Sequence, residues 1–88
     1  MERDTFMEIL AREGFREVVT VTREAGGFLD THAHPFEAKA LILSGGLRLR
    51  AGDEDQFYRT GEVFHLLAGK PHSEQYGPEG VTYLVGRR

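Results

Sequence analysis

Residues 31–46 read THAHPFEAKALILSGG, and this stretch puts two histidines one residue apart. In a β-strand, residues i and i+2 point to the same face, about 6.6 to 6.8 Å apart along the chain. His32 and His34 are therefore expected to project side by side from a strand over residues 28–34. Imidazole binds a divalent metal at about 2.0 to 2.1 Å, so both rings can reach one ion. The stretch predicts part of a metal site.

The other ligands of such a site must come from elsewhere in the chain, because two imidazoles alone bind an ion weakly. The chain has four histidines and no cysteine, which excludes thiolate ligands and disulfides. The remaining two, His65 and His72, both lie in GEVFHLLAGKPHSEQYG, residues 61–77. This second stretch is therefore the source expected for a further histidine ligand.

Around these stretches the sequence alternates as β-strands do. Residues 16–24, REVVTVTRE, are rich in β-branched side chains, and in LRLR, residues 47–50, leucines and arginines take opposite faces. The other expected strands are 28–34, 38–44, 46–51, 56–59, 62–67, 72–76 and 81–86, separated by glycine-containing segments that read as turns. Seven or eight short strands predict an antiparallel sandwich or barrel.

Only the N-terminal part of the chain has helical periodicity. Asp4 is a suitable N-cap and Gly14 a suitable C′ residue for a short helix within about residues 4–14. The apolar side chains at helical spacing are Phe6, Ile9 and Leu10. Because no linker or repeat follows, we expect a single domain over residues 1–88, with a β-barrel over 16–88. The fold class predicted is all-β with one short N-terminal α-helix.

The composition of the chain indicates which classes of partner to expect. Fourteen acidic residues outnumber eleven basic ones, so we expect neither a nucleic-acid nor a membrane partner, and MERDTFMEI at the start is no signal-peptide pattern. A cytoplasmic protein is expected. The absence of asparagine and the excess of arginine fit a thermophilic source, and they fit a GC-rich genome equally well. Because a chain of 88 residues buries little surface and residues 17–22 carry β-branched side chains on both faces, we expect a homodimer.

Two spacing patterns in the chain resemble the two motifs of the cupin family. The first runs from Gly26 over five residues to His32-Ala33-His34 and on to Gly45. The second has Gly61, five residues, Leu67-Ala68-Gly69, two residues, His72, three residues and Tyr76. The resemblance covers residues 26–76. It implies a small antiparallel, jelly-roll-like cupin barrel with a divalent metal held inside by histidines of both motifs.

Carried over residue by residue, the resemblance makes His32, His34 and His72 the metal ligands. The cupin pattern usually has a glutamate where this chain has Ala38, and Glu37 lies one residue early. Strand alternation points Glu37 away from the metal, unless a bulge just before it turns the side chain inward. Two sites therefore stay open, one with three histidines and one that adds Glu37. Zinc, iron, nickel, copper and manganese all remain possible, because imidazole does not select among them.

Three neutral imidazoles leave the double charge of the ion uncompensated and leave positions free for water or an anionic ligand. One hypothesis is therefore a metal-dependent enzyme acting on a small anionic molecule. The resemblance implies dioxygenase-like or isomerase-like chemistry, in which Glu37 or His65 would move a proton as a catalytic acid or base. The alternative is a non-catalytic barrel that binds or senses a small ligand, with a structural metal or none. In that case His65 is an ordinary core or surface histidine.

Overall fold

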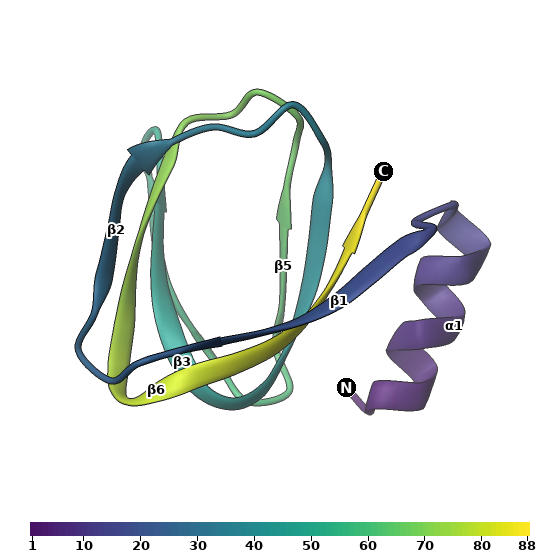
Figure 1. Ribbon diagram of the computed structural model, residues 1–88, viewed down its shortest axis with the longest axis horizontal. Helices are drawn as coiled ribbons and strands as arrows, with labels where there is room; N and C mark the ends of the chain where they lie inside the picture. Colours follow the sequence, from purple (N-terminus) through teal and green to yellow (C-terminus); the bar gives the residue numbers. More distant parts are fainter.

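One helix and six strands make up the structure, a computed structural model that describes residues 1–88 (Figure 1). In chain order they are α1 (Arg3–Glu13), β1 (Glu17–Arg23), β2 (Phe28–His32), β3 (Ala38–Ala51), β4 (Glu54–Arg59), β5 (Val63–Leu66) and β6 (His72–Arg87). Every strand pair is antiparallel. The strands curl into a barrel, and α1 lies against its outside (Figure 1). The predicted all-β barrel with one N-terminal helix is confirmed.

Two long strands, β3 and β6, form the centre of the sheet. The main strand order is β1-β6-β3-β4, while β2 also pairs with β6 and β5 with β3. β3 has 14 residues and β6 has 16, where the sequence predicts two short strands and a turn in each case. The turns predicted at 45–46 and 77–80 are therefore wrong, and the barrel has six strands instead of seven or eight.

The glycines at these two places bend paired strands instead of reversing the chain. The register of β3 on β6 shifts between Ile42 and Ser44 and again between Gly45 and Leu47. Gly45 and Gly80 both have positive φ, 68° and 73°. A Cβ atom on Gly45 would run into the carbonyl group of Gly80. Glycine is needed here because the two backbones approach closely at a bulge, a situation that reads like a turn in the sequence.

Apolar clusters lie on both faces of β3. Ala40 and Ile42 belong to the cluster inside the barrel, whereas Leu41 points outward and packs with Phe6 and Leu10 of α1. The outer cluster is completed by Phe15 and Leu84. Burying a side chain such as Phe or Leu contributes about 1.5 to 3 kcal/mol. Helix α1 thus covers apolar surface that the barrel alone would expose.

The helix itself differs from prediction at one end only. Glu2, not Asp4, occupies the N-cap position, and Asp4 lies in the first turn, where its charge complements the helix dipole. The helix ends as predicted at Gly14, whose N–H donates to the carbonyl groups of Leu10 and Ala11. With 11 residues in α1, no helix of the structure has the length and hydropathy of a membrane span.

Candidate metal centre

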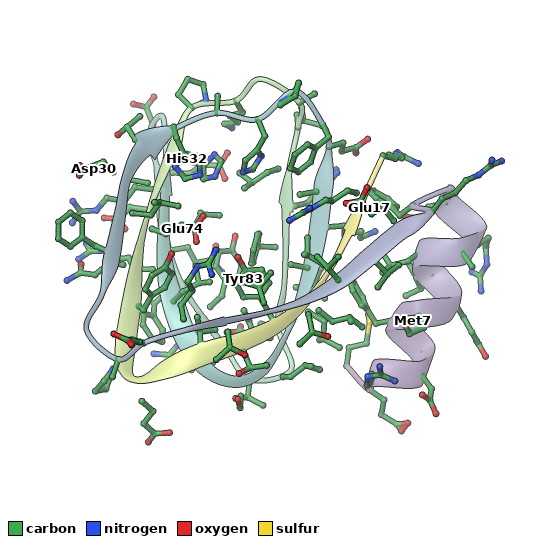
Figure 2. All side chains as sticks on the ribbon, in the orientation of Figure 1. Met7, Glu17, Asp30, His32, Glu74 and Tyr83 are labelled. Carbon is green, nitrogen blue, oxygen red and sulfur yellow. The ribbon has the colours of Figure 1, made fainter.

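His32 and His72 face each other across two paired strands. In the register of β2 and β6 these two residues are direct partners. The centroids of their rings lie 4.2 Å apart. Figure 2 shows His32 pointing into the barrel from the end of β2. This pairing brings together the two histidine-containing stretches of the sequence.

His34 reaches the same place from beyond the end of β2. That strand ends at His32, so the predicted strand extends two residues too far. The backbone N–H of Gly69 donates to the carbonyl oxygen of His34 at 2.8 Å, which ties His34 to the turn before β6. The ring of His34 stacks on Phe36 with centroids 4.5 Å apart and lies 4.8 Å from the ring of His72.

The three histidines converge inside the barrel. One ligand nitrogen from each of His32, His34 and His72 lies within 4.8 Å of the other two. His72 is only 1% exposed, and its Nε2 atom has no hydrogen-bond partner. An unpaired buried ring nitrogen is costly, and a metal ion satisfies it. The structure thus brings together all three residues predicted as ligands, and their geometry fits a divalent ion.

Backbone hydrogen bonds hold two of the imidazoles in a metal-binding form. Nδ1 of His72 lies 3.0 Å from the carbonyl oxygen of Lys70, and Nδ1 of His32 lies 2.8 Å from that of Asp30. A carbonyl oxygen only accepts, so both Nδ1 atoms donate and both Nε2 lone pairs are free. Burial, and then the nearby imidazoles of His72 and His32, lower the pKa of His34. A lowered pKa favours the neutral ring that a metal requires.

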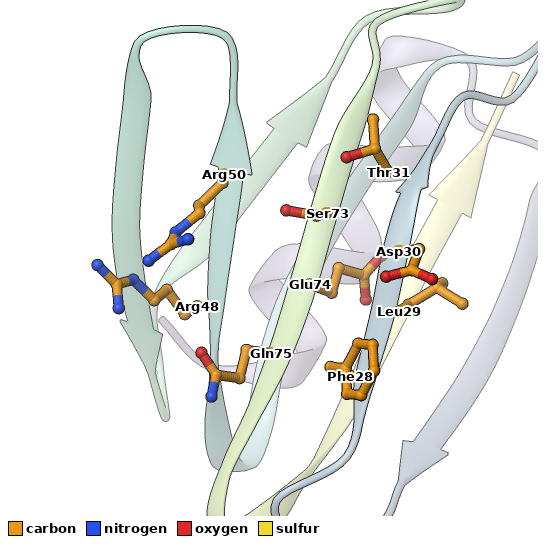
Figure 3. Close-up of a pocket in the computed structure, with 9 residues that line it drawn as sticks. All are labelled: Phe28, Leu29, Asp30, Thr31, Arg48, Arg50, Ser73, Glu74 and Gln75. Carbon is orange, nitrogen blue, oxygen red and sulfur yellow. The ribbon is translucent and has the colours of Figure 1, made fainter.

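A buried carboxylate, Glu74, shares this site although sequence reasoning did not single it out. Its Oε2 atom lies 3.6 Å from Nε2 of His72 and 3.9 Å from Nε2 of His32. Figure 3 shows Glu74 on the opposite side of β6 from Ser73 and Gln75. The signal was present in the sequence, because Glu74 lies two residues after His72 and a strand directs both to one face.

Two buried tyrosines flank this carboxylate. The Tyr76 hydroxyl donates to Oε1 of Glu74 at 3.4 Å. Burial, followed by the negative charge of Glu74, raises the pKa of both Tyr76 and Tyr83. Both phenols therefore stay protonated, and that of Tyr76 donates to the carboxylate.

A cavity of about 280 Å³ opens beside the histidines. His32, His34 and Glu74 line it, together with Arg23 and Arg87. The sequence did not identify the two arginines, because only the curl of the barrel brings the ends of β1 and β6 to the same cavity. The apolar wall is formed by Phe36, Ala38, Phe64, Leu66, Tyr83 and Val85. The volume lies slightly below the roughly 300 to 1,000 Å³ of common ligand sites, so any ligand is small.

Glu37 and His65 lie together outside this cavity. The carboxylate of Glu37 is 2.5 Å from Nε2 of His65 and 2.7 Å from Nε of Arg88. The hydrogen bond from Arg88, and then the one from His65, lower the pKa of Glu37. Neither Glu37 nor His65 lines the histidine cavity. The side chain of Glu37 therefore lies away from the three histidines, as strand alternation predicts, and the acid and base roles of the pair stay a prediction that the geometry does not support.

A larger hollow of about 370 Å³ lies between β2, β6 and β3 (Figure 3). Its basic side chains are Arg48 and Arg50, and both already have an acidic partner. Asp55 lies 2.7 Å from the guanidinium of Arg48 and 3.5 Å from that of Arg50. No histidine lines this hollow, so the metal centre is confined to the smaller cavity.

Several solved structures have the same barrel. DMSP lyase DddQ from Ruegeria pomeroyi superposes with a TM-score of 0.74 at 25% identity, over 81% of this chain and 36% of its own. Oxalate decarboxylase from Bacillus subtilis gives 0.72 at 24% identity, over 80% of this chain and 20% of its own. An RmlC-like cupin from Shewanella frigidimarina superposes with a TM-score of 0.69 at 14% identity, over 80% of this chain and 63% of its own. The chain thus spans less than two thirds of each of these structures.

No protein-family model matches the chain, and no curated protein matches it by sequence. The barrel nevertheless identifies the fold. The chain has the double-stranded β-helix fold of the cupin superfamily. The lyase and the decarboxylase above share this barrel.

Proposed function

We propose that the protein binds a divalent metal ion through His32, His34 and His72 and uses it to hold a small anionic molecule in the barrel. The buried Nε2 atom of His72 carries this proposal, because it lacks a hydrogen-bond partner and faces two further imidazoles. Zinc, iron, nickel, copper and manganese all accept such ligands. When bound, the ion supplies Lewis acidity toward a coordinated oxygen atom.

The anionic character of the ligand is supported by two arginines of the cavity. Arg23 and Arg87 line it together with the histidines. The guanidinium of Arg87 lies 5.0 Å from the ring of Phe36 and pairs with the exposed Glu17 at 3.1 Å, whereas Arg23 makes no ion pair. Guanidinium groups pair well with carboxylates, often through two parallel hydrogen bonds. A small carboxylate in this cavity would meet positive charge as well as the metal.

Two candidate functions, an enzyme and a binding protein, differ in whether the site converts its ligand into a product. The lyase and the decarboxylase with the same fold favour an enzyme. A non-catalytic binding barrel is favoured by the cavity itself, since Glu37 and His65, the predicted acid and base, lie outside it. Both candidates use the same metal site, so the metal is tested first.

We also propose that two copies of the chain form a homodimer through β1. This strand pairs only with β6, and its other edge has no strand beside it. An unpaired edge is open to pairing with a second chain.

Elemental analysis of the protein, purified without chelator or affinity tag, tests the metal site. The wild type and His65→Ala should each hold about one equivalent of metal per chain, because His65 lies outside the cavity. His72→Ala should hold almost none. Oxalate, added as a probe carboxylate, should bind the metal-loaded wild type by calorimetry and fail to bind His72→Ala.

The controls separate the possible results. Metal that persists in His72→Ala would place the ion elsewhere in the chain. Absence of metal from the wild type, even after reconstitution, would overturn the proposed function. Metal without oxalate binding would remove the anionic ligand and leave a structural ion.

A further inference from the structure

We propose that Glu74 is the fourth protein ligand of the metal, supplied by β6 instead of by the first motif. This inference rests on the proposed function, since it assumes an ion at the three histidines. It assigns a residue that neither the motif spacing nor the resemblance points to. The site then has three imidazoles and one carboxylate, with two of its ligands, His72 and Glu74, on one face of one strand.

The distances place the carboxylate close to a coordinating position. Ligand atoms bound at about 2.1 Å to one ion lie roughly 3.0 to 3.4 Å apart in octahedral or tetrahedral geometry. Oε2 of Glu74 lies 3.6 Å from Nε2 of His72 and 3.9 Å from Nε2 of His32. A movement of roughly half an ångström, within reach of a side-chain torsion, brings the carboxylate onto the ion.

The burial of Glu74 calls for a positive charge. Its side chain is only 7% exposed. The nearest nitrogen atoms are Nε2 of His72 and of His32, which carry no charge in the metal-binding form, and no lysine or arginine lies within 4.0 Å. A buried carboxylate is costly unless a charge compensates it. A divalent ion among the histidines provides that charge, and the carboxylate in turn neutralises half of the charge of the ion.

The first motif leaves room for this arrangement. Ala38 stands where the cupin pattern usually has a glutamate, and it lines the cavity with a methyl group only. Glu37 is held outside by Arg88 and His65. No carboxylate of the first motif therefore enters the cavity, and Glu74 is the acidic residue that lines it.

Tyr76 orients the proposed ligand. Its hydroxyl donates to Oε1 of Glu74, which leaves Oε2 as the atom nearest to His72 and His32. Partners that hydrogen-bond to a ligating carboxylate fix its direction and tune the metal. The assignment therefore includes the atom, Oε2, as well as the residue.

Cobalt loading of the full chain tests the assignment. The metal is removed with a chelator, Co²⁺ is added, and both its affinity, by chelator competition, and its visible spectrum are measured. Glu74→Gln keeps the shape of the side chain and removes its charge. We expect its Co²⁺ affinity to fall at least as far as the roughly 10- to 100-fold that loss of an outer-shell partner costs, and its visible bands to change. Glu54→Gln is the matched control, because Glu54 is 76% exposed and pairs with Lys70; it should match the wild type.

The outcomes separate this inference from the proposed function. If the wild type binds no Co²⁺, both fail together. If the wild type binds Co²⁺ at His72 and Glu74→Gln has the same affinity and spectrum, only the role of Glu74 is overturned. A weaker affinity with an unchanged spectrum would also overturn it, since Glu74 would then act without touching the ion. Should Glu74→Gln fail to fold, Glu74→Asp retains the charge but withdraws the carboxylate, and an unchanged spectrum in that variant contradicts coordination.

Discussion

At the scale of single residues, the site is arranged around one nitrogen atom, Nε2 of His72. It is buried and has no hydrogen-bond partner, while Nδ1 of the same ring donates to the backbone of Lys70. A ring held in this way has one tautomer and one free lone pair. The proposed carboxylate, Glu74, follows two residues later on the same strand. Short-range geometry on β6 therefore sets two of the four proposed ligands.

Glu37 should make the stability of the protein depend on pH. Its pKa lies below the usual value of 4.5 because Arg88, and then His65, bond to its carboxylate. A lowered pKa in the folded state stabilises the fold above the unfolded pKa, and this contribution is lost as pH falls through the lowered value. The stability difference between wild type and Glu37→Gln should therefore be full well above pH 4.5 and shrink as the pH falls below it.

Urea unfolding of the metal-free protein at each pH measures this difference, so that metal release does not contribute. Glu8→Gln is the control, because Glu8 is an exposed helical residue that makes no ion pair; its difference from the wild type should not vary with pH. A constant difference for Glu37→Gln as well would show that the contacts with Arg88 and His65 contribute nothing to folding.

The histidines of the site were predictable, and the other residues of the cavity were not. His32, His34 and His72 follow from spacing that resembles two known motifs, and the register of β2 on β6 brings them together. The alternation of side chains along a strand, which directs His72 and Glu74 to one face, could have indicated Glu74 as a residue of the site. Arg23 and Arg87 carry no such signal, because their place at the cavity depends on how far the two ends of the sheet curl.

At the scale of the elements, the glycines of the two long strands explain why two predicted turns are wrong. Gly45-Gly46 and the segment 77–80 contain residues typical of turns, yet they lie within β3 and β6. Local sequence does not distinguish a turn from a bulge, because both need backbone angles that glycine favours. Only the pairing of β3 with β6 decides, and that pairing joins residues far apart in the chain.

Gly45→Ala should destabilise the protein more than an alanine at an ordinary glycine with positive φ. Gly52, with φ of 59°, has open space where a Cβ atom would lie and serves as the comparison. Gly52→Ala should lower the free energy of unfolding by about 1 to 2 kcal/mol, from the positive φ alone. Gly45→Ala adds a clash with Gly80, and overpacking costs about 1 to 3 kcal/mol more. Urea unfolding measures both, and equal losses would contradict a close approach of the two strands.

At the scale of the whole molecule, the open edge of β1 bears on assembly. If two chains pair there, light scattering at micromolar concentration should give twice the chain mass of 9.9 kDa. Thr20→Pro, in the middle of β1, removes a backbone N–H and should weaken the pairing if that group faces the partner. Thr22→Pro, two residues on, has its N–H on the same edge as Thr20 and repeats the test. A measured mass of 9.9 kDa for the wild type would contradict the proposed homodimer.

The architecture as a whole was predictable because the motif spacing extends over most of the barrel. The helix, the antiparallel strands and the convergence of three histidines all agree with the sequence-based prediction. The exact number of strands and the end of β2 did not, since both depend on contacts between distant segments. The ends of a strand are set by its pairing with distant segments, and local strand propensity gives only their approximate position.

The central position of β6 also governs when the protein can fold. This strand pairs with β1, β2 and β3, and it is the last of the six in chain order. While a ribosome has released only residues 1–71, β1 and β2 have no neighbour in the sheet, and their edges are exposed to other nascent chains. The barrel closes only once residues 72–87 emerge. Because His72 begins that strand, the three histidines can converge only after these residues have joined the sheet.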